Sequence, residues 1–316
     1  MAKCLVTGGA GFIGSHVVDG LVAAGHQVRV LDNFSTGLER NLSHLNGKIE
    51  IYRDDVRHRD AVRRAVEGCD YVFHLAAVRA VYRSVDDPSE TNDINITGTL
   101  NVLLSAKEKG ARRVIFTSSS AVYGNSKRFP TRESDPLEPE SPYGASKIMG
   151  EYYCRLFHQL YGLETVVLRY FNVYGPRQNP ESKYSMVVPI FIECLLKGTP
   201  PEIHWDGKQS RDFLYVDNVV EGNLKAMRAV GVSGEAFNIG TQEEFSVLDI
   251  YHTLEKVLGR HVEPVYGPRR PGDVRRTLAD IGKAKKKLGF KVQTRFKEGL
   301  AKTAQWFVES GSFKAG

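Results

Sequence analysis

The amino-acid sequence predicts an α/β fold, a doubly wound parallel sheet with a smaller C-terminal cap. Three observations support this prediction. Short apolar runs alternate with segments of helical periodicity over residues 3–171, as expected where crossover helices join parallel strands. A glycine-rich turn follows the first apolar run, where a strand would lead into a helix. Beyond Phe171, prolines and glycines become more frequent and the predicted elements become shorter.

The change in texture predicts two domains. Residues 1–171 are expected to form the sheet domain. Residues 172–316 are expected to form mainly the cap, in non-contiguous pieces that partly return to the sheet. A cleft between cap and sheet would be the natural place for a second ligand.

The first 32 residues read as a Rossmann-type βαβ unit. A strand at residues 3–7 leads into Thr7-Gly8-Gly9-Ala10-Gly11-Phe12-Ile13-Gly14, and a helix follows until Gly25. Glycines at this turn let the backbone approach a pyrophosphate at the helix N-terminus. The second strand, residues 27–31, ends at Asp32, which would bind a ribose diol and repel a 2′-phosphate. The unit therefore predicts NAD in preference to NADP.

The alternation continues to residue 169. Strands are predicted at residues 49–52, 71–75, 113–118 and 165–169. One predicted helix ends at Val66, and two others span residues 88–109 and 143–161. Ligands of a doubly wound sheet bind at the carboxyl ends of the strands, where Gly8, Asp32, Asp55, Ala76 and Ser119 fall. His74, in the same region, is interpreted as a packed or loop-fixing histidine rather than a ligand.

Composition narrows the class of protein. The chain is 41% hydrophobic and 25% charged, as in ordinary globular proteins, and its formal net charge of +6 is dispersed. The one dense basic run, residues 283–287, is interpreted as a solvated helix face rather than a nucleic-acid patch. The four cysteines lie far apart, which argues against a metal site or disulfides. Without a membrane-length apolar stretch or a signal peptide, a cytoplasmic protein with no membrane or nucleic-acid partner is expected.

A candidate acid–base pair stands at Tyr143 and Lys147. The two residues are four apart in a predicted helix, so they share one face. A cation beside a phenol favours the phenolate and lowers the tyrosine pKa, which suits a proton shuttle in an alcohol–ketone interconversion. The same spacing also occurs in surface pairs, so the pair gains its meaning from the rest of the chain.

Four signals in order resemble a known family. They are the Thr7 to Gly14 turn, Ser118-Ser119-Ser120-Ala121-Val122-Tyr123-Gly124 at a strand end, the Tyr143/Lys147 pair, and Arg169-Tyr170-Phe171-Asn172. Together they resemble the extended short-chain dehydrogenase/reductase superfamily, and within it the nucleotide-sugar 4-epimerases, from Cys4 to about Trp306. The resemblance implies NAD-dependent epimerisation at C4 of a UDP-hexose through a 4-keto intermediate.

The resemblance also implies roles for individual residues. Tyr143 would be the acid–base, Lys147 would set its pKa and hold the nicotinamide ribose, and Ser119 would bind the C4 oxygen. Cofactor contacts are expected from Gly8, Gly11, Phe12, Ile13, Gly14, Asp32, Asn33, Ser35, Gly37, Asp55, Val56, Leu75, Ala76, Ala77, Asn95, Tyr143, Lys147 and Tyr170. Within this set, Asn95 resembles a buried asparagine on the long helix that steadies the site. Substrate contacts are expected from Arg79, Ser119, Ser120, Asn172, Val187, Arg211, Arg270, Asp273 and Thr277.

Within the substrate set, Arg211 and Arg270 would clamp the pyrophosphate, since guanidinium groups bind phosphate oxygens in a bidentate way. Asp273 would accept from the uridine ribose. Ser118 and Ser120, on either side of Ser119, are interpreted chiefly as structural hydroxyls at the strand end.

Sister families help to separate the reactions. Nucleotide-sugar 4,6-dehydratases carry an Asp-Glu pair straight after the position of Ser119, and UDP-glucuronate decarboxylases usually place a glutamate near it. This chain has Ser120-Ala121 there, so simple epimerisation is expected. Two other classes stay open: a nucleotide-sugar reductase that releases NAD(P), and a non-catalytic NAD-sensing regulator. Asp32 and the two arginines of the cap, Arg211 and Arg270, count against the first, and the presence of Tyr143, Lys147 and Ser119 counts against the second.

Sugar identity rests on a few positions. Thr277 stands where a small residue leaves room for a 2-acetamido group, and Arg177-Gln178-Asn179-Pro180 with Tyr184-Ser185 resembles the branch that accepts N-acetylhexosamines. Arg79 and Tyr82 depart from both branches, so UDP-glucuronate stays an alternative. The expected substrates are UDP-glucose and UDP-galactose, with the N-acetyl forms tolerated.

The resemblance implies a homodimer in which helices 88–109 and 143–161 pair across a two-fold axis. Apolar residues in these helices suit either this interface or packing within the chain: Leu100, Leu103, Leu104, Tyr153, Leu156 and Phe157.

Overall fold

The computed structural model describes residues 1–78, 81–178, 187–269 and 274–311. Within these residues, seven strands form one parallel sheet in the order β11-β6-β5-β4-β1-β2-β3. The strands are β1 (Lys3–Thr7), β2 (Gln27–Asp32), β3 (Ile49–Arg53), β4 (Tyr71–His74), β5 (Arg113–Ser119), β6 (Glu164–Tyr170) and β11 (Glu235–Ile239). The chain runs outward from β1 in both directions, so the doubly wound parallel sheet predicted from the sequence is confirmed.

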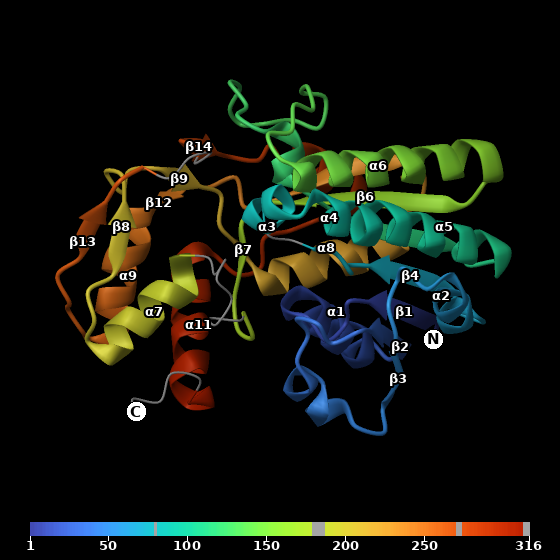
Figure 1. Cartoon of the computed structure of the whole chain (residues 1–316), viewed down its shortest axis with the longest axis horizontal. Helices are drawn as coiled ribbons and strands as arrows, with labels where there is room; N and C mark the ends of the chain where they lie inside the picture. The colour runs from blue at the N-terminus through green and yellow to red at the C-terminus, as the bar shows by residue number, and fades with distance from the viewer. Residues whose placement is uncertain (79–80, 179–186, 270–273, 312–316) are drawn as a thin grey trace.

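Helices cover both faces of this sheet (Figure 1). One face carries α1 (Phe12–Ala23) and α8 (Val216–Arg228), and the other carries α2 (Arg59–Val66), α5 (Gly98–Glu108) and α6 (Pro142–Tyr161). Cys4 and Val6 of β1 belong to the core under α1 and α8, while Leu5 belongs to the core under α2, α5 and α6. Burial on both faces explains why the strands read as continuous apolar runs.

The region predicted as one helix over residues 88–109 is built differently. It contains α4 (Pro88–Asn92), a π-helical turn η3 (Asp93–Thr97) and α5, and a short helix α3 (Val81–Asp86) precedes it. The extra residue of a π-turn redirects a side chain, and such turns are frequent at functional sites. Asn95 lies in this turn. Its side-chain oxygen accepts from the N–H of Val78, and its side-chain N–H donates to the carbonyl of Val78.

Two buried arginines tie crossover helices to the sheet. Arg29 of β2 donates through Nη1 to Ala65 O at 2.6 Å and to two further carbonyls at the end of α2. Arg113 of β5 donates in the same way to Ala226 O at 2.7 Å, Met227 O at 3.1 Å and Ala229 O at 2.8 Å at the end of α8. A cation at a helix C-terminus satisfies carbonyls that have no partner inside the helix.

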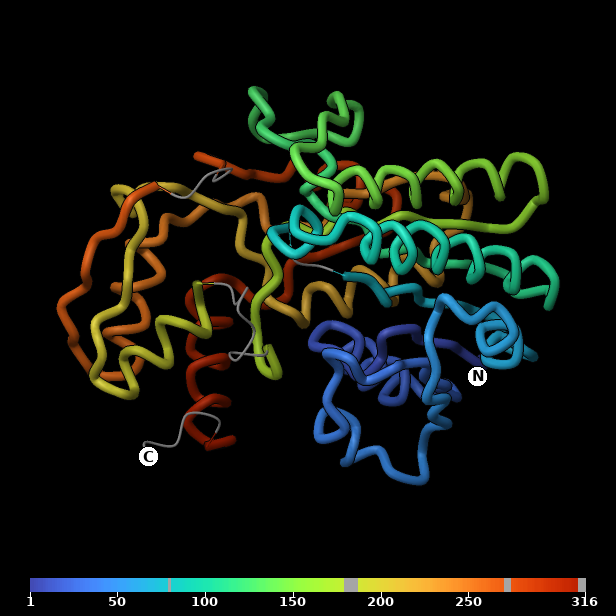
Figure 2. Tube along the Cα trace, in the orientation of Figure 1, coloured from blue at the N-terminus to red at the C-terminus, as the bar shows by residue number. Residues whose placement is uncertain are grey.

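The smaller part of the chain lies beside the sheet and contains α7 (Val187–Lys197), α9 (Val247–Leu258) and α11 (Phe296–Ser310) (Figure 2). It also holds three small sheets: β7 (Val173–Tyr174) with β10 (Leu214–Tyr215), β8 (Glu202–His204) with β13 (Val265–Gly267), and β9 (Ser210–Arg211) between β12 (Phe245–Ser246) and β14 (Arg276–Thr277). Helix α10 (Gly282–Leu288) packs on β11 and α8, so the chain returns to the main sheet after leaving it.

An aromatic cluster in the smaller part continues the core of the main sheet. Phe296 stacks on Phe245 with ring centroids 3.8 Å apart and also contacts Phe213 and Tyr174. These rings belong to the same continuous core as the residues under α1 and α8. Among the described residues, no helix combines the length and the apolar character that crossing a membrane requires.

The arginine at the end of α8 gives a stability test. Arg113→Met should lower the free energy of unfolding by about 2 kcal/mol, because it leaves three carbonyls without their charged donor. Urea unfolding followed by tryptophan fluorescence measures this. The neighbouring Arg112 is exposed, so Arg112→Met is the matched control and should change stability by no more than about 0.5 kcal/mol. Equal effects of the two substitutions would contradict the capping role.

Candidate functional site

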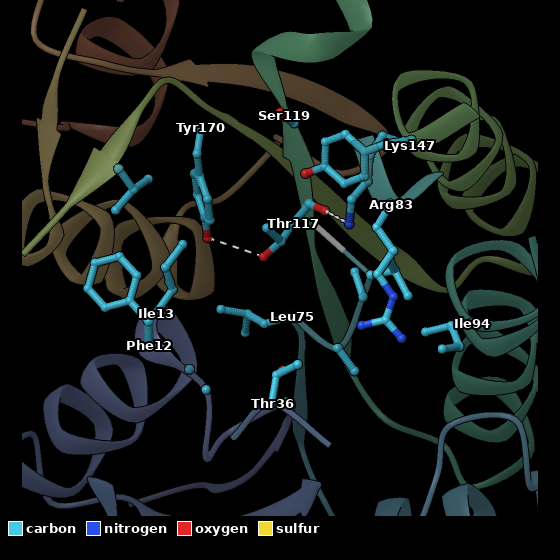
Figure 3. Close-up of a pocket in the computed structure, with 18 of the residues that line it drawn as sticks. Phe12, Ile13, Thr36, Leu75, Arg83, Ile94, Thr117, Ser119, Lys147 and Tyr170 are labelled. Carbon is cyan, nitrogen blue, oxygen red and sulfur yellow. Dashed lines mark hydrogen bonds between the residues drawn. The ribbon is translucent and has the colours of Figure 1, made fainter. Parts of the chain in front are cut away.

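One large cavity of about 660 Å³ opens along the carboxyl ends of the strands. Residues that follow β1, β2, β4, β5 and β6 line it from the sheet, and Asn172, Val173, Arg211, Val274 and Thr277 line it from the smaller part. Figure 3 shows Phe12 and Ile13 on one side of this space and Thr117, Ser119 and Lys147 on another. The cavity thus lies where the strand order reverses, as expected for ligands of a doubly wound sheet.

The glycine turn after β1 is shaped for a group that approaches the backbone. Gly8 has a φ of +69°, and a Cβ at Gly14 would stand 2.0 Å from the Gly8 carbonyl oxygen. Neither position therefore admits a side chain. Because α1 begins at Phe12 on the cavity wall, its first N–H groups lie at the turn. A helix N-terminus without side chains is suited to the diphosphate of a dinucleotide.

Carboxylates close the next two strands. Asp32 accepts from the backbone N–H of Ala10 and of Phe34, both at 2.8 Å, and burial raises its pKa against these bonds. Asp55 accepts from Asn33 Nδ2 at 2.7 Å and from Arg57 through Nε and Nη2, both at 2.9 Å. Burial alone would raise the pKa of Asp55, but the bonds from Arg57 and Asn33 outweigh it and lower the pKa to about 2.

Two residues of the predicted cofactor set do not line the cavity, and one of them, Asn95, is the buried asparagine expected to steady the site. Gly37 is not among the lining residues and sits against Ala10 and Asp32, where a Cβ would approach their side chains to 2.8 and 3.0 Å. Asn95 does not line the cavity either. Its amide donates to Val78 O at 3.0 Å and Ser146 Oγ at 2.9 Å and accepts from Val78 N at 2.8 Å. Asn95 therefore holds Val78 of the wall in place, whereas Gly37 leaves the space that Ala10 and Asp32 occupy.

His74 fixes the loop after β4, in agreement with the packed or loop-fixing role predicted from the sequence. Thr99 uses its hydroxyl hydrogen on Asn95 O, so His74 Nε2–H donates to Thr99 Oγ1 at 2.9 Å. His74 Nδ1 then accepts from Thr7 Oγ1 at 2.7 Å, and Thr7 Oγ1 accepts from the N–H of Ala76. Burial lowers the pKa of His74 to about 3, so the ring is neutral.

Helix α6 carries the predicted acid–base pair, Tyr143 and Lys147. Ser141 caps it by accepting from Gly144 N at 3.1 Å, and Pro142 occupies its first turn. Lys147 is buried, donates through Nζ to Thr117 O at 2.9 Å, and lies 5.8 Å from the ring centroid of Tyr143. Burial lowers the pKa of Lys147 to about 8, partly opposed by the charge of Glu151, so the amine is largely protonated at neutral pH.

The serines at the end of β5 divide in two. Ser119 and Ser120 line the cavity, and Ser119 Oγ accepts from Ala121 N at 3.2 Å, where it caps the short helix η4 (Ser120–Tyr123). Ser118 reaches the cavity wall, but its hydroxyl donates to Glu151, which is buried and paired with Arg169 at 2.6 Å. The structural reading of Ser118 agrees with this contact.

The smaller part brings three predicted substrate residues together. Arg211 and Thr277 are direct register partners in the parallel pair β9 and β14. Asn172 Nδ2 donates to Thr277 Oγ1 at 3.0 Å and to Asp212 O at 3.2 Å. Val187 begins α7 and is not a lining residue. Arg79, Arg270 and Asp273 lie outside the described residues.

Other predicted cofactor contacts line the cavity as expected: Gly11, Ile13, Ser35, Val56, Leu75, Ala77 and Tyr170. The structure adds residues that the sequence did not single out, above all Arg57, Arg83, Glu90 and Thr117. Arg83 donates to Glu90 through Nε at 2.9 Å and Nη2 at 2.7 Å. In the sequence, opposite charges seven residues apart indicate an ion pair on one helix face. Pro88 between them argues against a continuous helix, so the pair is not predicted.

Three comparisons with known proteins agree with this geometry. The model of the NAD dependent epimerase/dehydratase family matches residues 4–240. A putative UDP-glucose 4-epimerase from Methanocaldococcus jannaschii is 41% identical over 304 residues, which are 96% of this chain and 97% of that protein.

Solved structures are similarly close. The UDP-glucose 4-epimerase of Thermotoga maritima with UDP-glucose superposes with a TM-score of 0.93 at 42% identity, over 98% of this chain and 99% of that one. The UDP-N-acetylglucosamine 4-epimerase of Methanobrevibacter ruminantium, in complex with UDP-N-acetylmuramic acid, gives 0.94 at 38% identity, over 98% and 99%. The chain therefore belongs to the NAD dependent epimerase/dehydratase family.

Proposed function

We propose that this protein is an NAD-dependent UDP-hexose 4-epimerase. One observation carries the proposal: the glycine turn, the Tyr143/Lys147 pair and Arg211 line the same cavity. A dinucleotide on the glycine turn and a nucleotide sugar beside Arg211 would then meet at the acid–base pair. The position after Ser119 holds Ser120-Ala121, without the carboxylate that an elimination needs, and Glu140 on the wall is exposed.

The residues divide the work of the reaction. Tyr143 takes the proton of the C4 hydroxyl and later returns it, while Ser119 donates to the C4 oxygen and holds it beside the phenol. Lys147 keeps a positive charge near Tyr143 and so favours the phenolate. NAD, held at the glycine turn by residues such as Gly8 and Gly14, would supply a hydride acceptor for C4 of the sugar. Arg211 and Asn172 retain the nucleotide while the 4-keto sugar turns.

The wall supports a neutral sugar. Arg83, one of its charged groups, is paired with the carboxylate of Glu90. A carboxylated sugar would need a cation of its own, since an unpaired charge is costly to bury. Thr277 is small and its hydroxyl already accepts from Asn172, which leaves room for a substituent at C2. UDP-glucose and UDP-galactose, with their N-acetyl forms tolerated, are therefore the proposed substrates.

A homodimer through α6 is also proposed. Met149, Tyr152, Leu156 and Leu160 lie on one face of this helix with side chains 39% to 66% exposed. Of the residues considered from sequence, Leu103 and Phe157 are buried within the chain, whereas Leu156 belongs to this exposed stripe. An apolar stripe of this kind on a long helix fits pairing with a second copy of itself.

Tyr143 gives the direct test of the chemistry. Tyr143→Phe should lower the turnover of UDP-glucose to UDP-galactose by at least about 10³-fold, because the phenol oxygen that moves the proton is gone. NMR of purified protein without added NAD measures the conversion. Tyr152→Phe is the control, since Tyr152 is an exposed tyrosine of the same helix. Unchanged turnover in Tyr143→Phe would exclude the proposed role.

Thr277 tests the sugar. The unmodified protein should convert UDP-glucose and UDP-N-acetylglucosamine and leave UDP-glucuronate unchanged, as separate NMR incubations would report. Thr277→Tyr should lower conversion of the N-acetyl sugar by more than about tenfold and retain UDP-glucose, because the larger ring fills the space at C2. Thr277→Ser is the matched control and should convert both. Turnover of UDP-glucuronate alone would show the sugar assignment to be wrong.

The α6 stripe tests the assembly. Light scattering after gel filtration should give twice the chain mass, and Leu156→Glu should shift it towards the single chain, because the interface would bury an unpaired carboxylate. Val308→Glu, on an exposed apolar residue of α11, should leave the mass unchanged. A single-chain mass for the unmodified protein would contradict the proposed dimer.

A further inference from the structure

The phenol of Tyr170 stands at the cavity wall in an unusual hydrogen-bond setting. Its oxygen accepts from Asn223 Nδ2 at 2.7 Å and from Thr117 Oγ1 at 3.3 Å, and Figure 3 shows the second contact across the cavity. Burial raises the pKa of Tyr170 to about 12, so the phenol keeps its hydrogen at neutral pH. The contact with Thr117 is long for two hydroxyls. The Asn223 contact therefore determines how the phenol is oriented.

Asn223 is committed to the role of donor. It lies in α8, is 1% exposed, and its Nδ2 also donates to Val219 O at 2.8 Å. Its Oδ1 is buried and has no hydrogen-bond partner among the described residues. Turning the amide over would satisfy Oδ1 through the phenol but would place it against Val219 O, a second acceptor. An unpaired buried carbonyl is thus tolerated so that the N–H side faces Tyr170.

The phenol hydrogen is consequently directed away from Asn223. Since Asn223 Nδ2–H and Thr117 Oγ1–H both donate to the phenol oxygen, the phenol hydrogen points away from both of them, and Tyr170 lines the cavity. Tyr170 then presents a donor to whatever occupies this part of the cavity. A donor held in place by a buried amide costs little reorganisation when an acceptor arrives.

Thr117 connects this donor to the acid–base pair. Its backbone carbonyl accepts from Lys147 Nζ at 2.9 Å and its hydroxyl contacts Tyr170, so one residue of β5 touches both. The group that meets Tyr170 must therefore lie beside Lys147 and Tyr143. If the protein is an NAD-dependent epimerase, that group belongs to the reactive end of the cofactor, whose carboxamide oxygen is an acceptor.

We propose that Asn223 is a positioning residue that sets Tyr170 as a hydrogen-bond donor to the carboxamide of the NAD nicotinamide. This inference rests on the proposed function for the identity of the cofactor. Asn223 touches neither reactant and acts only through Tyr170. By holding the nicotinamide ring in one orientation, Asn223 and Tyr170 retain the cofactor while the 4-keto sugar rotates in the same cavity.

The test measures cofactor binding, which needs no sugar. Asn223→Leu keeps the approximate volume and removes the donor, and it should weaken NAD binding to cofactor-stripped protein about tenfold. Tyr170→Phe should weaken it to a similar degree. Because Asn223 acts through Tyr170, the double variant should bind NAD no more weakly than Tyr170→Phe alone. Calorimetric titration gives the dissociation constants, and the KM for the UDP-sugar should stay unchanged.

Asn218→Leu is the matched control. Asn218 is also a buried asparagine of α8, but its amide binds Thr294 and Gln293 next to α11. Its loss should lower stability without a change in NAD affinity. If Asn223→Leu fails to fold, Asn223→Ala replaces it, with the same comparison to Tyr170→Phe.

Two results would overturn the inference: NAD affinity unchanged in the Asn223 variants, or losses from Asn223→Leu and Tyr170→Phe that simply multiply. Neither depends on which sugar is converted. A protein that binds NAD as expected but converts no UDP-hexose would instead contradict the proposed function.

Discussion

The bond from Lys147 to the carbonyl of Thr117 is the interaction on which the site depends. It ties the second turn of α6 to the end of β5, and it holds a buried cation beside the phenol of Tyr143, the proposed acid–base. Lys147 is buried, which lowers its pKa, and the charge of the nearby Glu151 partly opposes this shift. A shift of α6 along the sheet would break this bond and move Tyr143 and Lys147 together away from the end of β5.

The sheet supplies the frame that positions the two partners of this bond. Parallel strands end at one edge, so Gly8, Asp32 and Thr117 reach the same cavity although they are distant in sequence. Buried cations also secure the frame: Arg29 and Arg113 hold the far ends of α2 and α8. Helix α8 then contributes Asn223 to the cavity's supporting layer, which links the fixing of a crossover helix to the orientation of Tyr170.

The smaller part reaches the cavity through very little regular structure. Two-residue strands pair Arg211 with Thr277. The buried carboxylate of Asp212, the next residue, fixes this segment by accepting hydrogen bonds from Thr241, Gln242 and Ala279. Burial raises the pKa of Asp212 to about 6 even with these bonds. Short strands anchored by one carboxylate position polar side chains precisely, yet they leave no periodic pattern in the sequence.

The sequence by itself determined the parallel α/β sheet, the glycine turn, and the Tyr143/Lys147 pair, because each depends on residue types at short, fixed spacings. Only the tertiary structure showed that Asn95 sits in a π-turn and supports Val78 instead of lining the cavity. The pairing of Arg57 with Asp55, the contact of Asn172 with Thr277, and the donor role of Asn223 towards Tyr170 were likewise decided by packing. The physical reason is that hydrogen-bond partners far apart along the chain are chosen by where the elements dock, which local sequence patterns do not encode.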